Sequence, residues 1–154
     1  DYYAVQAFLE LTDEEGFKNG MKIRTDYDSS DPETWYYTYD YQYEGQTYTR
    51  YVGFTFDALN GNIFSLDFAD IYDLGLVGSL DLSNCSYLNY LDCERGGLTS
   101  LNLSNCSSLQ YAFCGENNIS WVNFSGCDAL KRIFLYFLYI CFKCINVFHI
   151  TFHK

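Results

Sequence analysis

Residues 79–93 read SLDLSNCSYLNYLDC, and residues 100–114 read SLNLSNCSSLQYAFC. A more divergent third copy, SWVNFSGCDALKRIFL, occupies residues 120–135. One cysteine position recurs every 21 residues, at Cys85, Cys106 and Cys127. Repetition with a period of about 20–50 residues is typical of solenoids, in which each coil buries its apolar side chains against the next coil. The repeat therefore predicts a solenoid.

The pattern inside each unit indicates the class of solenoid. From Leu88 onward the unit is L-x-x-L-x-C-x-x-G/N-x-L/I, and it recurs from Leu109. This pattern resembles the leucine-rich repeat consensus with cysteine in place of one strand leucine, and it is similar to the cysteine-ladder repeats of internalin-like bacterial surface proteins. The resemblance implies an α/β-horseshoe fold that is mostly β, with about four coils in a right-handed solenoid and a single curved parallel sheet.

Two recurring positions have a structural interpretation. Cys93 and Cys114 are also 21 residues apart. Small apolar thiols stacked on successive coils predict a buried column that needs no disulfides, because free cysteine is among the most buried residue types. Asn117 is expected to bond to backbone groups that a tight turn leaves unpaired, whereas Gly96, at the same position one coil earlier, has no side chain for this role.

The chain divides into three regions by pattern: a cap over residues 1–60, repeats over residues 61–135, and a hydrophobic tail over residues 136–154. Solenoids need atypical terminal units to cover their open ends, which is the role expected of the cap. A short amphipathic helix is predicted between Asp1 and Gly16. Its apolar residues at helical spacing are Ala4, Val5, Phe8, Leu9 and Leu11.

Alternating aromatic residues mark the second element of the cap. They run with a two-residue period from Trp35 to Tyr43, reach the turn sequence Glu44-Gly45, and are followed by a second apolar run that ends at Phe56. This pattern predicts a β-hairpin. We expect one aromatic face of the hairpin to pack on the cap, although exposed tyrosine rings also suit the stacking of sugar rings.

The tail breaks the repeat. It reads YFLYICFKCINVFHITFHK and lacks the Asn, Ser and Gly turn residues of the earlier coils. Two interpretations stay open: a buried terminal strand or capping segment, and a non-native C-terminus such as that produced by a change of reading frame. The apolar run from Ile133 to Phe142 is shorter than the roughly 20 residues that span a membrane, so membrane insertion is not expected.

Composition and motifs argue against several functions. The net charge is −11, and residues 1–70 hold 14 acidic against 4 basic side chains, which disfavours nucleic acid as a partner. The two histidines, His149 and His153, lie in the tail, so the repeats offer no imidazole base to a nucleophile. Neither the acidic loop at residues 25–34 nor the C-x2-C-x4-H-x3-H pattern of the tail has the context of a metal site. We therefore expect no enzyme activity, cofactor or metal.

The surface of the predicted sheet is the best candidate for a functional site. Side chains that flank the buried strand leucine point outward, because successive strand residues alternate between faces. The candidate partner-binding residues are Asp67, Tyr90, Asp92, Tyr111, Phe113, Arg132 and Phe134. Tyrosine, phenylalanine and arginine are enriched at the centres of protein interfaces. The pattern therefore predicts a binding face for a protein or a glycan.

The resemblance adds expectations about biology. It implies a non-catalytic recognition or adhesion module of an exported bacterial protein, placed outside the cell or on its surface, although no signal peptide is visible at Asp1. A carbohydrate-binding module centred on the tyrosine hairpin is one alternative. A structural spacer within a longer adhesin is the other.

Overall fold

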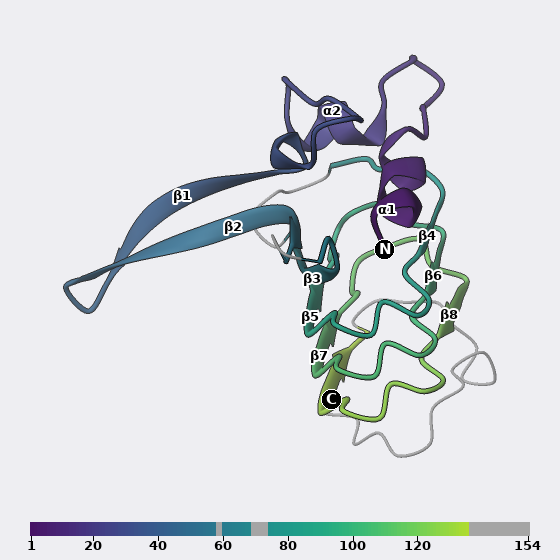
Figure 1. Ribbon diagram of the computed structural model, residues 1–154. Coiled ribbons are helices and arrows are strands. Elements are labelled where there is room, and N and C mark those ends of the chain that lie inside the picture. The colour runs from purple at the N-terminus through teal and green to yellow at the C-terminus, as the bar shows by residue number, and fades with distance from the viewer. Residues whose placement is uncertain (58–59, 69–73, 136–154) are drawn as a thin grey trace.

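The computed structural model describes residues 1–57, 60–68 and 74–135. The helical elements are α1 (Tyr2–Leu9), α2 (Asn19–Ile23) and the 3-10 turn η1 (Pro32–Thr34). The strands are β1 (Tyr36–Tyr43), β2 (Gln46–Phe56), β3 (Ile63–Asp67), β4 (Ser79–Asp81), β5 (Tyr90–Asp92), β6 (Ser100–Asn102), β7 (Tyr111–Phe113), β8 (Trp121–Asn123) and β9 (Arg132–Phe134). The prediction of a mostly β solenoid is confirmed, with about three turns of parallel strands (Figure 1).

The solenoid has two parallel sheets, so the prediction of a single sheet was wrong. Strands β3, β5, β7 and β9 pair in one sheet, and β4, β6 and β8 pair in the other, on the far side of the coils (Figure 1). The second sheet forms because Leu80, Leu101 and Val122 are buried between more exposed neighbours, which is the two-residue period of a strand. Each complete coil therefore contributes one strand to each sheet.

The turn after each strand of the second sheet needs a left-handed residue. Asn84 and Asn105 have φ angles of 65° and 62°, and Gly126 takes the same place with a φ angle of 75°. Asparagine and glycine are the residues that adopt this region most readily. An added Cβ at Gly126 would lie 2.5 Å from Oδ1 of Asn105, so the coils stack closely at this corner.

The interior of the coils follows the repeat. All five cysteines among the described residues are free and buried, and the Cys106 thiol donates to the Leu82 carbonyl at 3.1 Å. Cys127 makes the equivalent bond to Leu103 at 3.0 Å. The Asn117 amide donates to the carbonyls of Cys93, Cys114 and Gly115 and accepts from the Leu98 N–H, which confirms its predicted role.

The helix of the cap is shorter than predicted. It ends at Leu9 rather than near Gly16, because the chain leaves the helix there and Thr12 forms an isolated β-bridge with Lys18. The predicted apolar face is only partly right: Val5, Phe8 and Leu9 are buried, whereas Ala4 and Leu11 are exposed.

Buried Asn19 joins the cap to the first coil. Its amide donates to the carbonyls of Phe8 and Val77, and its Oδ1 accepts from the Val77 N–H. The uncharged side chain of Asn19 thus satisfies backbone hydrogen-bonding groups of both the helix and the first coil. These hydrogen bonds fix the helix against the coil.

The predicted hairpin is confirmed, but it packs on the cap only at its base, where Phe54 and Phe56 contact Phe8 and Tyr2 of α1. Strand β1 pairs with β2 around Glu44 and Gly45, whose φ angles of 49° and 78° suit a tight hairpin turn. Strand β2 also pairs antiparallel with β3, so the hairpin extends the first sheet to six strands. Its far end projects away from the coils (Figure 1).

The tyrosines at the far end of the hairpin pack on one another rather than on the cap. Tyr39, Tyr41, Tyr43 and Tyr48 are all exposed. Tyr41 and Tyr48 stack with ring centroids 5.7 Å apart. The strand alternation predicted the common face of these rings, but their position beyond the body of the protein depends on the length and direction of the hairpin.

Residues 136–154 lie outside the described residues. The interpretations of the tail as a strand, a cap or a non-native end therefore stay predictions. Within the described ranges, none of the helices is both long and apolar enough to span a bilayer.

Candidate functional site

The predicted binding residues lie in two aligned rows on the six-stranded sheet. Strand pairing places Asp67, Asp92, Phe113 and Phe134 side by side on consecutive strands. The second row is Ser65, Tyr90, Tyr111 and Arg132. We call this surface the strand-row face. Its acidic half comprises β3 and β5, with Asp67, Tyr90 and Asp92, and its aromatic half comprises β7 and β9, with Tyr111, Phe113, Arg132 and Phe134.

Stacked rings form the aromatic half. Phe113 and Phe134 lie with centroids 4.5 Å apart and planes only 4° from parallel. Tyr90 continues the contact from β5, with its centroid 5.8 Å from that of Phe113. All three rings are half-buried by one another and by the sheet, so each keeps a surface that a partner can contact. Arg132 beside them is exposed.

A hydrogen-bonded pair of side chains borders the aromatic half, and it was not identified from the sequence. Lys131 donates to Oε1 of Gln110 at 2.6 Å, and its ammonium lies 6.0 Å from the centroid of the Tyr111 ring. This distance is at the outer limit of a cation–π contact. Gln110 and Lys131 are 21 residues apart and adjacent to predicted residues, so the alignment of the repeats could have identified them.

An ion pair organises the acidic half. The Arg50 guanidinium, on β2, donates to both carboxylate oxygens of Asp67, at 3.1 and 3.0 Å. The two side chains are less exposed than a typical surface pair, at 29% and 14%. The hairpin therefore supplies the counter-charge to the first coil, a pairing that no spacing in the sequence indicates.

The expectation that all residues of the two rows are exposed is wrong for Asp92. It is only 5% exposed, and its carboxylate accepts from the Tyr90 hydroxyl at 3.3 Å and from the Glu94 N–H at 3.2 Å. Burial, with a further contribution from the negative charges of Asp67 and Glu94, raises the pKa of Asp92 to about 6. Burial and the neighbouring Asp92 carboxylate raise the pKa of Tyr90 above its usual range.

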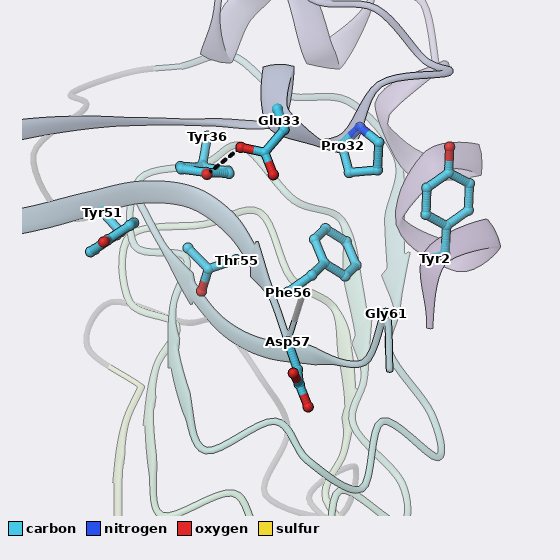
Figure 2. Close-up of a pocket in the computed structure, with 9 residues that line it drawn as sticks. All are labelled: Tyr2, Pro32, Glu33, Tyr36, Tyr51, Thr55, Phe56, Asp57 and Gly61. Carbon is cyan, nitrogen blue, oxygen red and sulfur yellow. Dashed lines mark hydrogen bonds between the residues drawn. The ribbon is translucent and has the colours of Figure 1, made fainter. Parts of the chain in front are cut away.

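Two hollows meet beside the acidic half, at the base of the hairpin. One has a volume of about 320 Å³ and lies between the hairpin, η1 and α1 (Figure 2). The other has a volume of about 650 Å³ and extends over β3 to Tyr87. They share Tyr51, Thr55, Phe56 and Asp57 and are therefore adjacent, and we call the two hollows together the hairpin-base groove.

Sequence reasoning did not identify this groove. Its aromatic residues come from separate segments, namely Tyr2 on α1, Tyr36, Tyr51 and Phe56 in the hairpin, Phe64 on β3 and Tyr87 in the next coil. The pairing of β2 with β3 brings the hairpin beside the first coil, and the pairing of β3 with β5 brings the next coil beside both. One feature of the sequence could have indicated this groove. Tyr87 is aromatic, whereas Ser108 and Ala129 occupy the same position in the later coils.

The described residues offer little for other chemistry. No group of three or more histidine, cysteine, aspartate or glutamate side chains among them is placed to hold a metal ion. In the acidic loop, Arg24 pairs with Asp26, and Asp28 accepts from the N–H and hydroxyl of Ser30. The carboxylates of Asp26 and Asp28 are therefore engaged in an ion pair and in local hydrogen bonds.

No protein-family model matches the chain, and no curated protein sequence or solved structure does so either.

Proposed function

We propose that this protein is a leucine-rich-repeat-like recognition module that binds a protein partner through the strand-row face, without catalysing a reaction. The observation that supports the proposal most is the stack of Phe113 on Phe134, beside Tyr111 and the exposed Arg132. The stack occupies outward positions of the sheet, where the fold itself does not require aromatic side chains. Aromatic and arginine side chains grouped on a rigid sheet are typical of interface centres.

Charge favours a protein over a small molecule as the partner. Arg50 balances the charge of Asp67, so Asp92 and Glu94 are the acidic residues that make one end of the strand-row face negative, and Lys131 and Arg132 make the other end positive. A surface with two signs of charge favours one orientation of an extended partner. The resemblance of the repeats to those of bacterial surface proteins supports an extracellular setting, which we include in the proposal.

The proposal can be tested by selecting peptides from a displayed library on the wild-type protein and measuring their affinity for variants. We expect the double variant Tyr111→Ala/Arg132→Ala to weaken binding about tenfold or more, because residues of these types dominate interface energies. Its free energy of unfolding should change by less than about 1 kcal/mol, because neither side chain is part of the core.

Trp121→Ala is the matched control, since Trp121 is an exposed aromatic residue on β8 of the other sheet. We expect this variant to bind as the wild type does. Equal affinity of the wild type and of Tyr111→Ala/Arg132→Ala for every selected peptide would reject the strand-row face as the binding surface.

A second candidate function, carbohydrate binding by the hairpin, is supported by the exposed rings of Tyr39, Tyr41 and Tyr43. Amphipathic aromatic rings suit the apolar faces of sugars. A glycan array probed with the wild type and with Tyr39→Ala/Tyr41→Ala distinguishes the candidates. Glycan signals that disappear in this variant, with peptide binding unchanged, would support the hairpin.

A further inference from the structure

We propose that the hairpin-base groove is a second binding site, which receives a lysine or arginine side chain from an extended basic segment of a partner protein. This inference goes beyond the proposed function, because the groove is built from residues outside the strand-row pairs described above, apart from Ser65 at its edge. Either surface can therefore fail its test without the other.

The size and the lining of the groove suit a peptide side chain and its backbone. Volumes of about 320 and 650 Å³ for the two hollows lie in the range of about 300–1,000 Å³ that is usual for ligand sites. Tyr51, Phe64 and Tyr87 are each more than half exposed, at 51%, 56% and 56%. These rings form the walls along which an aliphatic side-chain stem would lie.

Charge complementarity favours a cationic guest. The described residues that line the two hollows include the carboxylates of Glu33 and Asp57 and no lysine or arginine. The surrounding N-terminal region is strongly acidic, with 14 acidic against 4 basic side chains in residues 1–70. A cleft lined by one sign of charge concentrates ligands of the opposite sign.

The smaller hollow has the geometry to hold a cation. The Tyr36 hydroxyl donates to Oε2 of Glu33 at 2.7 Å, as Figure 2 shows, and this hydrogen bond is the main reason that the pKa of Tyr36 is raised. A phenol that donates to a carboxylate has a more electron-rich ring, which strengthens attraction to a cation. The rings of Tyr51 and Tyr36 contact each other, with centroids 5.9 Å apart, so an ammonium or guanidinium beside the pair could lie within about 6 Å of both centroids.

The packing of the repeats does not explain these aromatic residues. By strand register, Asn89, Gln110 and Lys131 replace Phe64 in later coils. Serine and alanine replace Tyr87, at Ser108 and Ala129. Aromatic side chains therefore occupy these positions only where the first coils meet the hairpin. Exposed rings that coincide with a groove indicate a binding role rather than a requirement of the coil.

The groove can be tested by isothermal titration calorimetry with an octapeptide of alternating glycine and lysine. The same octapeptide with every lysine acetylated is the uncharged control. We expect the lysine peptide to bind the wild type and the acetylated peptide to bind at least about tenfold more weakly, because acetylation removes the cation. The double variant Tyr51→Ala/Asp57→Asn should lose about tenfold in affinity for the lysine peptide.

Two further variants separate a specific site from general attraction to an acidic protein. Asp128→Asn makes the same charge change in an exposed turn of the last coil, and we expect its affinity to change by less than about twofold. Tyr51→Phe keeps the ring and should keep wild-type affinity. Melting curves of each variant check the fold. Asp57→Asn keeps a side-chain oxygen at this position, which could still accept the hydrogen bond that the Asn60 amide donates to Asp57 in the wild type.

Three results would overturn the inference. The first is unchanged affinity of a folded Tyr51→Ala/Asp57→Asn protein for the lysine peptide. The second is an equal loss of affinity in Asp128→Asn, which would mean that net charge alone attracts the peptide. The third is binding of a neutral cello-oligosaccharide that depends on Tyr51 while the lysine peptide does not bind, which would make the groove a glycan site.

Discussion

The acidic and aromatic halves of the strand-row face share one backbone geometry and differ in most of their outward side chains. In the acidic half, Asp67 is paired with Arg50 and Asp92 is nearly buried. In the aromatic half, Phe113 and Phe134 occupy the equivalent row and stack on each other. The repeat therefore determines the positions of the side chains, whereas different types of side chain can occupy the outward positions.

The interior below the two halves also differs, and this gives the largest expected effect. Leu66, Leu91, Ala112 and Ile133 are paired neighbours inside the sheet, with a small residue only under the aromatic half. Leu91→Ala should lower the free energy of unfolding by about 2–5 kcal/mol, because it leaves a cavity under the acidic half. Urea denaturation measures this loss, and a change below about 1 kcal/mol would mean that the coil can collapse around the missing side chain.

The buried carboxylate makes the acidic half sensitive to pH. Because the pKa of Asp92 is about 6 in the folded protein and near 3.8 in an unfolded chain, the native state binds a proton that the unfolded state does not bind between these values. The contribution of Asp92 to stability should therefore improve as pH falls from about 7 to about 4, by at most about 3 kcal/mol.

Asp92→Asn isolates this effect from that of the other carboxylates, several of which have lowered pKa values and act in the opposite direction. Subtracting the stability of the variant from that of the wild type at each pH should give a difference that favours the wild type increasingly as pH falls through 6. A difference independent of pH would contradict the raised pKa of Asp92.

The ion pair across β2 and β3 gives a smaller effect. Arg50→Ala leaves the Asp67 carboxylate half-buried without its bidentate partner and should cost about 1–2 kcal/mol. Arg95→Ala is the matched control, because it breaks an equally bidentate pair with Glu116 on an exposed corner and should change stability little. Equal losses for the two variants in thermal unfolding would mean that the hairpin does not depend on this pair.

The sequence predicted the interior better than the surroundings of the surface residues. The 21-residue period placed Cys93 and Leu91 correctly, because each has a buried apolar counterpart one coil away, at Cys114 and Ala112. The role of Asn117 followed from its side-chain chemistry, since Gly96 takes its place one coil earlier. The second sheet was missed because the leucine-rich repeat resemblance implied one sheet, although the alternation around Leu101 was visible. A resemblance can thus conceal a local signal.

Much of the candidate site depends on contacts between distant segments. Strand alternation predicted that Asp92 points outward, but its burial depends on Tyr90 and on the local fold around Glu94. The hairpin-base groove depends on how β2 pairs with β3, a register set by long-range contacts that the repeat does not encode. Periodicity specifies the face on which a residue lies, and not what covers it.

Hydroxyl-radical footprinting of the wild type with a selected peptide tests the central claim most directly, because it measures the solvent exposure of individual side chains. We predict that oxidation of Tyr111, Phe113 and Phe134 falls when the peptide binds, while oxidation of the exposed Trp121 on the other sheet stays the same. Protection of Trp121 with unchanged oxidation of Tyr111 and Phe134 would contradict recognition through the strand-row face.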